Sequence, residues 1–519
     1  MSSGQGKVVI VGGGIAGLCA GVFALRCGYE VELVEMHERP GGLATSWRRN
    51  GYVFETCLHW LLGSNPQRRM HAHWREVFDI DRLHFVHPAE YVRIETDTGE
   101  RLVVHSDPDR LEDELLRLSP GDAHESRRFV AAVREFRDIE IPEPPVGFRG
   151  WLGLIAALPR LPALHHWTQI SLEDYGRRFN HPLLKRFFGG GESGDLSAIA
   201  IVLTLAWMGR GDAAYPIGGS QAVIQGITDA FCRLGGHLRL GARVDEILVK
   251  DRAALGVRLS DRQTIQGDWV ISAADGHATI YDLLHGRFRD NAIDDAYRTM
   301  APFASYAQVS LGIAQSLSAQ PGYVIHVPGA PIQLDPGTAL DEIAFRVFNY
   351  DPTFAPPGRT SVTSVLPTRN FSYWTALRCS DPTWYEAQKR RLADAVIDVL
   401  SHRIPGVGNA IEVVDVSTPA TVIRYTGNWQ GSMEGWLITP ATGLRHLPNT
   451  LPGLKRFLMA GQWVAPGGGL PGGLMSARAT VQAMCRLDHR PFSVSGPVAL
   501  ADGQPVGFGG HIRSPGTEG

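Results

Sequence analysis

The sequence predicts an α/β protein that combines a Rossmann-type dinucleotide-binding domain with a second domain of mixed sheet and helices. Two segments support this fold class: a strand, glycine-rich turn and helix over residues 7–27, and a second strand, glycine loop and helix over residues 454–486. The chain of 519 residues is long enough for two domains with a sizeable core.

The first fifty residues contain the clearest local pattern. Residues 7–11 and 31–34 are predicted to be buried strands, and the helix over residues 15–27 between them ends at Gly28. In the G-x-G-x-x-G motif the first glycine permits a tight turn, the second lets a pyrophosphate approach the backbone, and the third permits close packing of helix and strand. The helix N-terminus offers N–H groups to phosphates, and the acidic residue after the second strand accepts hydrogen bonds from a ribose. This unit assigns to a dinucleotide the residues Gly12, Gly14, Ile15, Ala16, Gly17 and Glu35.

A second glycine pair follows shortly after Glu35. Arg39-Pro40-Gly41-Gly42 matches the R-x-G-G pattern that flavin-binding proteins of the glutathione-reductase type commonly contain. The glycines would let this loop pass close to the phosphate and ribityl chain, and the arginine would offset negative charge. An ordinary Pro-Gly turn is the alternative interpretation. Together with the preceding unit, the pattern favours flavin adenine dinucleotide (FAD), held here by Arg39, Gly41, Gly42 and Leu43.

The glycine loop near the end of the chain predicts the other end of the same site. Residues 454–460 are predicted to be a buried strand, residues 461–473 a loop, and residues 474–486 a helix. The N-terminus of this helix could face the flavin pyrimidine ring and stabilise charge that develops on reduction. A backbone contact with the adenine could come from the segment after the strand at 237–240. The residues assigned on these grounds are Val244, Gly461, Gln462, Gly469, Leu470 and Pro471.

The rest of the chain alternates between the two domains. Glycines become sparse after residue 65 and amphipathic helices are predicted at 109–118 and 125–137, whereas strands predominate from about residue 302 to 438. The expected elements are a hairpin at 47–54, strands at 256–259, 264–271, 306–313, 323–327, 343–349 and 361–366, and helices at 221–234 and 385–401. Residues 269–274 are also predicted to be a strand, one that returns to the central sheet. We assign residues 1–65, 211–295 and 440–487 to the FAD-binding domain, residues 66–210 and 296–439 to a substrate-binding domain with a helical cap, and residues 488–519 to a flexible tail.

One apolar segment, residues 146–167, has two interpretations. Its tryptophans and leucines are flanked by arginine and histidine, which is typical of a segment that enters a membrane interface. A helix pair that covers a substrate cavity is the other interpretation, and it is the one we favour.

Composition excludes several classes of function. The net charge of −3 and the pI near 6.7 provide no basic surface for nucleic acid. The six cysteines are widely spaced, without a C-x-x-C pair, which favours a reducing cytoplasm, and no metal-ligand spacing is visible. No signal peptide and no apolar run of about 18 residues is present, so we expect a cytoplasmic protein, at most peripheral on a membrane.

These motifs resemble the family of phytoene desaturases, carotenoid isomerases and retinol saturases, over residues 7–486. The segments that carry the resemblance are 12–17, Glu35, 39–42, 215–219 and 466–472. The resemblance implies a glutathione-reductase-type FAD-binding Rossmann fold with a second mixed-sheet and helical substrate domain, both discontinuous. It also implies non-covalent FAD, a long apolar tunnel that ends at the flavin ring, and frequent peripheral attachment to membranes. Gln462 departs from the pattern, because many related flavoproteins have Asp or Glu at this position.

The leading functional hypothesis is flavin-mediated hydride transfer to or from carbon of a small apolar substrate, an isoprenoid or polyene, by desaturation, saturation or isomerisation. If a side chain donates a proton, the candidates are His59, Arg424, Tyr425 and Glu434, each of which also has a purely structural interpretation. Two rivals remain: an amine or porphyrinogen oxidase on the same scaffold, and a non-enzymatic isoprenoid-binding escort protein.

Overall fold

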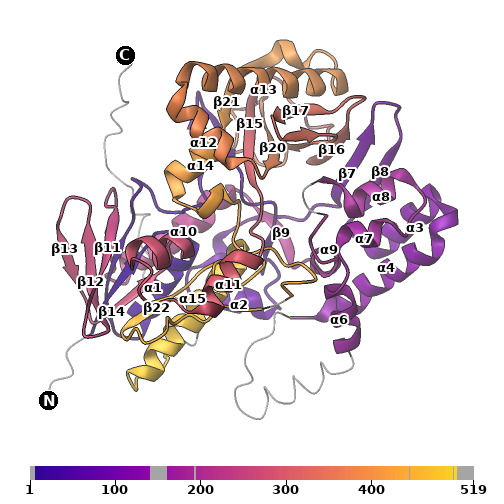
Figure 1. The fold of residues 1–519 in the computed structure, drawn as a ribbon. Coiled ribbons are helices and arrows are strands. Elements are labelled where there is room, and N and C mark those ends of the chain that lie inside the picture. The colour runs from indigo at the N-terminus through magenta and orange to yellow at the C-terminus, as the bar shows by residue number, and fades with distance from the viewer. Residues whose placement is uncertain (1–5, 141–159, 192–193, 444, 495, 499–519) are drawn as a thin grey trace.

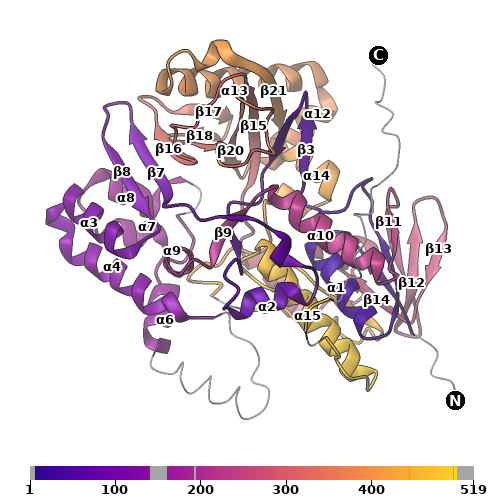
Figure 2. The same ribbon diagram turned by 180° about the vertical axis from the view of Figure 1, so that it is seen from behind.

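The structure is a computed structural model that describes residues 6–140, 160–191, 194–443, 445–494 and 496–498. The first and last described elements, coloured indigo and yellow in Figure 1, lie in one part of the molecule. A second part carries a large sheet with the orange helices, and a third part is a layer of purple helices. Figure 2 shows the same three parts from behind.

The first part is built on a five-stranded parallel sheet with the strand order β10–β2–β1–β14–β22. Its strands are β1 (Lys7–Val11), β2 (Glu30–Val34), β10 (His237–Arg239), β14 (Trp269–Ser272) and β22 (Phe457–Met459). Val8 and Ile10 pack against α1 (Ile15–Arg26), α10 (Gly219–Arg233) and α15 (Gly469–Leu487). Val9 and Val11 point to the opposite face, against the antiparallel sheet of β11 (Val244–Lys250), β12 (Ala253–Leu259) and β13 (Thr264–Gln266). Both faces are therefore buried, as a parallel sheet requires.

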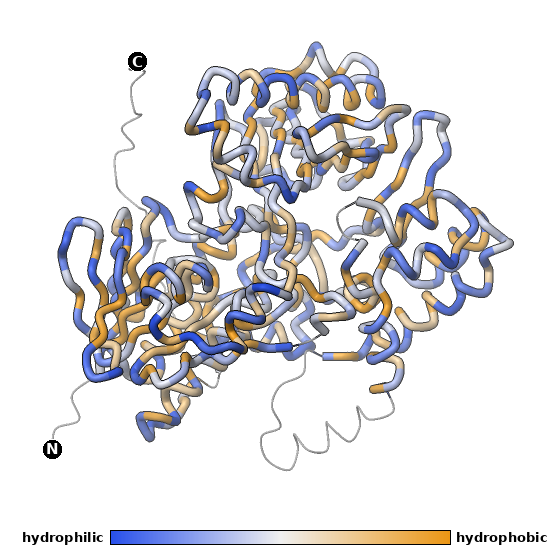
Figure 3. Tube along the Cα trace, in the orientation of Figure 1, coloured by the Kyte–Doolittle hydropathy of each residue, from blue (hydrophilic) through white to orange (hydrophobic). Residues whose placement is uncertain are grey.

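The second part contains a seven-stranded sheet with the order β21–β15–β20–β19–β16–β7–β8. Its strands are β7 (Glu90–Thr96), β8 (Arg101–His105), β15 (Ser305–Ile313), β16 (Tyr323–Val327), β19 (Ile343–Val347), β20 (Thr360–Thr368) and β21 (Ile411–Ser417). Only β7 and β16 pair in parallel. One face packs against α13 (Pro382–Arg403), with α12 (Phe371–Ser380) and α14 (Pro419–Thr426) beside it. Figure 3 shows hydrophobic residues gathered on the inner strands, with hydrophilic residues along the outer turns.

The third part is a helical layer on the other face of β7, β8 and β16. It comprises α3 (Pro108–Leu118), α4 (Ala123–Glu135), α6 (Leu161–Thr168), α7 (Leu172–Gly176), α8 (Pro182–Gly189) and α9 (Ile199–Gly209). An aromatic cluster of Phe129, Trp167, Tyr175 and Phe188 holds α4, α6, α7 and α8 together. Among the helices that the structure describes, none is long and apolar enough to cross a membrane.

The remaining elements are short. They include β3 (Ser46–Arg49), β4 (Tyr52–Glu55), β5 (Leu61–Leu62), α2 (Arg69–Arg75), β6 (Phe85–Val86), β9 (Ala213–Pro216), α11 (Asn291–Thr299), β17 (Ile332–Asp335), β18 (Thr338–Leu340), and the irregular turns η3 (Phe136–Asp138), η6 (Ala278–Leu283) and η8 (Trp429–Gly431). Strand β9 pairs with both β5 and β6.

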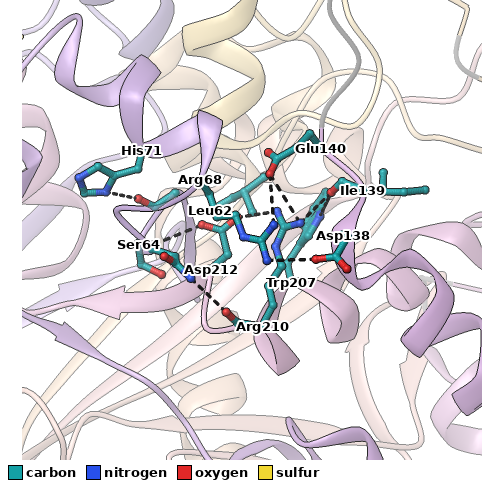
Figure 4. Close-up of polar contacts among 12 residues, drawn as sticks. Leu62, Ser64, Arg68, His71, Asp138, Ile139, Glu140, Trp207, Arg210 and Asp212 are labelled. Carbon is teal, nitrogen blue, oxygen red and sulfur yellow. Dashed lines mark hydrogen bonds and ion pairs between the residues drawn. The ribbon is translucent and has the colours of Figure 1, made fainter. Parts of the chain in front are cut away.

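An ion-pair cluster of Arg68, Asp138, Glu140, Arg210 and Asp212, buried at Arg210 and Asp212, connects the helical layer to β5 and β9 (Figure 4). Arg210 Nη2 donates to Asp212 Oδ2 at 2.6 Å, and the two side chains are 2% and 0% exposed. Arg210 Nη1 donates to the carbonyl oxygens of residues 137 and 139, at 2.8 and 2.9 Å. The guanidinium therefore holds the end of η3 against the start of β9.

Most of the predicted elements are confirmed. The hairpin at 47–54 turns at Asn50 and Gly51, both with positive φ (48° and 87°), as a type I′ turn requires. Three expectations were wrong. The predicted strand at 264–271 ends at Gln266 as β13, whereas the strand predicted at 269–274 is confirmed as β14 in the central sheet. Helix α15 begins at Gly469 instead of residue 474. Pro471 is tolerated there because the first N–H groups of a helix have no intrahelical partner.

The tail is the third difference. Val494 and Val498 are buried in the core beside α1 and α15, and Val498 N donates to the Arg75 carbonyl at 2.9 Å. The chain is therefore packed as far as Val498, and a flexible tail does not begin at residue 488. Residues 499–519 and 141–159, which include most of the apolar segment at 146–167, lie outside the described residues.

The predicted domain boundaries stay predictions. The pairing of β7 with β16 joins residues 66–210 and 296–439 in one sheet, as that assignment requires. In contrast, Met70 and Trp74 of α2 pack into the core beside α1 and α15, so this helix packs with the FAD-binding domain although it falls after residue 65.

Candidate functional site

A cavity of about 390 Å³ lies where β1, β2, β14 and β22 end. In open α/β sheets, ligands bind outside the carboxyl ends of the strands. The predicted cofactor-binding residues that line the cavity are Gly12, Gly14, Ile15, Ala16, Glu35, Gly41, Gly42, Leu43, Val244, Gly461, Gln462, Gly469 and Leu470. The fold thus brings together residues from both ends of the chain.

The first glycine loop has the geometry that its motif predicts. Gly12 has a φ of 97°, which L side chains rarely adopt. A Cβ at Gly17 would collide with the Gly12 carbonyl oxygen, so this glycine lies in the helix–strand contact and does not line the cavity. Around Gly14, in contrast, a Cβ would find no atom nearer than 3.9 Å. The space beside Gly14 at the α1 N-terminus therefore fits a pyrophosphate.

The R-x-G-G loop packs against the first glycine loop. Gly41 N donates to the Gly13 carbonyl at 2.9 Å, and a Cβ at Gly42 would lie 3.3 Å from the Gly14 Cα. Gly41 and Gly42 face the cavity, but the side chain of Arg39 is exposed and does not line it. Arg39 was predicted to hold FAD and offset its negative charge, but its side chain does not reach the cavity.

Glu35 stands at the end of β2 with its carboxylate held in place. Its Oε2 accepts from Gly13 N at 2.6 Å and its Oε1 from His37 N at 2.8 Å. Burial raises the pKa of this carboxyl, and the two N–H groups oppose that effect. The carboxylate lines the cavity and retains lone pairs for the two hydroxyls of a ribose.

At the other end of the cavity, the N-terminus of α15 faces inward. Gly461 N donates to Ser476 Oγ at 2.8 Å, which fixes the turn after β22 to this helix. Gln462 Nε2 donates to Asn428 Oδ1 at 3.2 Å. Gly469 and Leu470 line the cavity, whereas Pro471 does not.

Several lining residues were missed by sequence reasoning, among them Cys57, Asp275 and Asn428. Asp275 accepts hydrogen bonds from Ala278 N at 2.8 Å and from Trp429 N at 2.7 Å, and burial raises its pKa to about 6. An acidic residue three positions after the end of the buried strand β14 was the available signal, because that strand ends at the same sheet edge as β1.

The four candidate proton donors are not brought together. Glu434 lines the cavity, and Tyr425 lies at its rim with 45% of its surface exposed, beside His37. Arg424 is exposed and stacks on the Tyr425 ring. His59 packs edge-on against Tyr323, outside the cavity lining, where burial and then the charge of Arg346 lower its pKa well below the ordinary value. Only Glu434 therefore combines burial with access to the cavity.

The site can hold an elongated anionic ligand with an adenosine end and a ring end. Two helix N-termini, those of α1 and α15, supply N–H groups and a positive dipole at separate points of the cavity. Among the described residues, no group of three or more His, Cys, Asp or Glu side chains could hold a metal ion.

Comparison with known proteins agrees with this geometry. Residues 15–485 match the family described as flavin containing amine oxidoreductase. Phytoene desaturase (neurosporene-forming) of Rhodobacter capsulatus is 27% identical in an alignment 514 positions long that covers 93% of this chain and 94% of that protein. Prolycopene isomerase 1, chloroplastic, of an Oncidium hybrid cultivar is 22% identical and covers 89% of this chain and 81% of its own.

Solved structures share the fold at low identity. Putrescine oxidase bound to putrescine is 14% identical, with a TM-score of 0.59 over 93% of this chain and 99% of that one. Cyclohexylamine oxidase from Brevibacterium oxydans is 16% identical, with a TM-score of 0.58 over 94% of this chain and 100% of that one. Since the family match spans most of the chain and the fold is that of flavin enzymes, the protein belongs to the flavin-containing amine oxidoreductase family and is an FAD-dependent oxidoreductase.

Proposed function

We propose that this protein binds FAD non-covalently in the cavity and uses it to transfer hydride to or from carbon atoms of a carotenoid-like polyene. The observation that carries the proposal is one cavity lined by the dinucleotide glycines, Glu35 and the α15 N-terminus, in a chain whose relatives over about nine-tenths of its length are named phytoene desaturases. FAD supplies the redox chemistry, and the protein supplies position, electrostatics and exclusion of water.

The lining residues would hold the cofactor in a defined direction. Glu35 would bind the ribose, with the Val244 backbone beside the adenine. The N–H groups at the start of α1 would bind the pyrophosphate next to Gly14. Gly461, Gln462 and the start of α15 would hold the ring end. Cys57 contributes a thiol to the cavity lining. Because burial raises its pKa, the thiol stays protonated and is a poor nucleophile toward the ring. This favours non-covalent binding.

Apolar side chains next to the cofactor cavity support a polyene substrate. Cys57 lines the cavity, and two residues further along the chain His59 contacts Tyr323 on β16. On the same face of β16, Ile325 and Val327 are only partly buried against the helical layer, as are Phe187, Ile201 and Leu203 on α8 and α9. We assign this apolar space to the substrate-binding domain and place the polyene there, with one end directed past Cys57 toward the flavin.

Polyene turnover is the test of this function. The holoprotein, with oxidised or reduced flavin, is incubated anaerobically with a panel of polyenes, and the products are separated and weighed by mass spectrometry. A product two hydrogens lighter identifies a desaturase, a product two hydrogens heavier a saturase, and an unchanged mass with a shifted retention time an isomerase. Hydrogen peroxide formed from amines or oxidation of a porphyrinogen, with no change in any polyene, would contradict the proposal and favour an amine or porphyrinogen oxidase.

We also propose a cytoplasmic location with peripheral membrane contact through α6, the described end of the segment 146–167. Leu161 is 45% exposed, and Pro162 and His165 on the same helix are also exposed. Arg128 lies beside His166, within 2.8 Å, and adds positive charge close to this surface. An exposed leucine next to cationic groups is typical of helices that bind anionic lipid.

Leu161→Glu is therefore expected to reduce the fraction of protein that floats with phosphatidylglycerol vesicles several-fold. Burial of one leucine contributes roughly 1.5–3 kcal/mol, and the new charge repels anionic lipid. Leu255→Glu is the matched control, because this β12 side chain is 44% exposed but far from α6 in sequence and fold. Equal flotation of wild type and both variants would contradict the proposed contact.

A further inference from the structure

Glu434 occupies a distinctive place in the cofactor cavity. It follows η8 in the chain, and its side chain lines the cavity next to the N-terminus of α15. Gly468, the residue before that helix, has a φ of 54°, and a Cβ at this position would collide with Glu434 Oε2. The glycine thus gives the carboxyl room to approach the positive end of the helix dipole.

Glu434 differs from Glu35 and Asp275, two other carboxylates held in the cavity wall, because no described residue donates a hydrogen bond to its carboxyl. Glu35 and Asp275 each accept two backbone hydrogen bonds, whereas none to the Glu434 carboxyl is found among the residues that the structure describes. Burial raises the pKa of Glu434 to about 7, with no ion pair to oppose the shift. The carboxyl is therefore close to half protonated at neutral pH and free to change its state.

The titratable groups around Glu434 do not shift its pKa, so only a charge newly formed in the cavity would shift it. The charge of Glu434 acts on the thiol of Cys57, which stays protonated because burial, and then that charge, raise its pKa. The remaining titratable groups on the cavity walls are Glu35, Arg243, Asp275, Asp282 and Tyr425, and none of them contributes to the pKa shift of Glu434. A new negative charge at the α15 N-terminus would act on Glu434 directly, since like charges raise the pKa of a carboxyl.

We propose that Glu434 is a proton-holding residue that takes up one proton from solvent when the flavin in this cavity is reduced. The hydride that reduces the flavin carries two electrons and one proton, so it adds one negative charge to the cavity. The ionised Glu434 carboxylate then binds a solvent proton at Oε1 or Oε2 and restores the charge. Reduction consumes two protons per two electrons in total, one delivered in the hydride and one bound by Glu434. On reoxidation both are returned.

The sign of the pH dependence follows from this scheme. Below about pH 6 Glu434 is already protonated before reduction, and only the proton of the hydride is consumed. Above about pH 7 it is mostly ionised in the oxidised state, and the reduced state recruits the second proton. Each proton consumed changes the reduction equilibrium constant tenfold per pH unit, which is about 30 mV for a two-electron couple.

The test measures the flavin reduction potential of the holoprotein between pH 5.5 and 8.5. Near pH 7.5, wild type is expected to consume two protons per two electrons and Glu434→Gln one. Asp282→Asn, which removes another carboxylate of the cavity, is expected to keep the wild-type slope. Equal slopes for wild type and Glu434→Gln would overturn the proposal.

A second measurement covers the case in which Glu434→Gln does not retain flavin. Infrared difference spectra of the wild-type holoprotein at pH 7.5 are expected to gain a protonated carboxylic acid band on reduction, and Glu434→Asp to move that band. Absence of the band overturns the proposal. The inference rests on flavin binding in the cavity, and the two can fail separately: a protein that binds no flavin removes the proposed function, whereas bound flavin without the extra proton removes only the role of Glu434.

Discussion

Gly14→Val is expected to give a folded protein without flavin. Gly14 has φ −72° and ψ −176°, which any residue adopts, and a Cβ would have no neighbour within 3.9 Å. The fold can accept the valine, but its methyl groups would fill the space where the pyrophosphate has to approach the α1 N-terminus. We expect the affinity for FAD to fall at least about 100-fold, or about 2.7 kcal/mol. Flavin fluorescence titration of the apoprotein measures the loss.

Two further glycine variants show whether that loss is specific. Gly28→Ala introduces a side chain at a positive φ of 80° but far from the cavity, and should bind FAD as wild type does. Gly17→Ala should destabilise the fold itself, because its Cβ would collide with the Gly12 carbonyl. A yellow Gly14→Val protein with wild-type affinity would mean that the cofactor does not pass Gly14.

Asp212→Ala is expected to be the most destabilising single substitution among those considered, at about 3–5 kcal/mol. The change would remove the closest counter-charge of the buried Arg210 guanidinium, leaving it with Glu140 at 3.9 Å, and would remove the acceptor of Asn65 N. Since Arg210 also holds the carbonyl groups of residues 137 and 139, the helical layer should loosen first. The midpoint of urea unfolding and the protease sensitivity of the helical layer measure the effect.

An exposed ion pair provides the control for that substitution. Asp109 pairs with Arg134 but is 81% exposed, so Asp109→Ala should cost less than about 1 kcal/mol. If Asp212→Ala and Asp109→Ala shifted the unfolding midpoint equally, the Arg210 cluster would not be a structural connection between the helical layer and the rest of the molecule.

The parts of the fold that depend on local backbone chemistry were predictable. The strand at 7–11, the glycine turn, the helix and Glu35 follow from steric demands that only those residues satisfy, and the structure places them at one sheet edge. Likewise, the positive φ values at Asn50 and Gly51 are specified by the residue types themselves.

Pairing between distant segments was not predictable. The parallel contact of β7 with β16 joins residues about 230 positions apart, and nothing in either strand specifies its partner. The strand predicted at 264–271 overlapped the one predicted at 269–274, and the sequence did not show where one ends and the other begins. In the structure Gly267 N donates to the Leu255 carbonyl, whereas Asp268 N donates to that of Lys7, in another sheet. That division depends on partners far away in sequence.

The candidate site was predictable on its cofactor side and much less so elsewhere. Glycines and an acidic residue at fixed spacing specify a phosphate and ribose site, whereas a lone His or Arg carries no information on the direction of its side chain. Both Arg424 and His59 lie near cavity-lining residues in sequence, yet Arg424 points to solvent and His59 toward the helical layer. The sequence alone could not show these directions. Asp275 was missed because its place in the cavity wall depends on hydrogen bonds that it accepts from the backbone N–H groups of Ala278 and Trp429.

The most direct test of the account is the flavin content of the wild-type protein. The protein is purified, saturated with FAD, freed of excess cofactor and denatured by heat, and the supernatant is analysed by chromatography and mass spectrometry. We expect one intact FAD per chain in the supernatant and none attached to the polypeptide. A chain that retains no FAD, or one from which the flavin is released only after proteolysis, would contradict a non-covalent FAD site at the ends of β1, β2, β14 and β22.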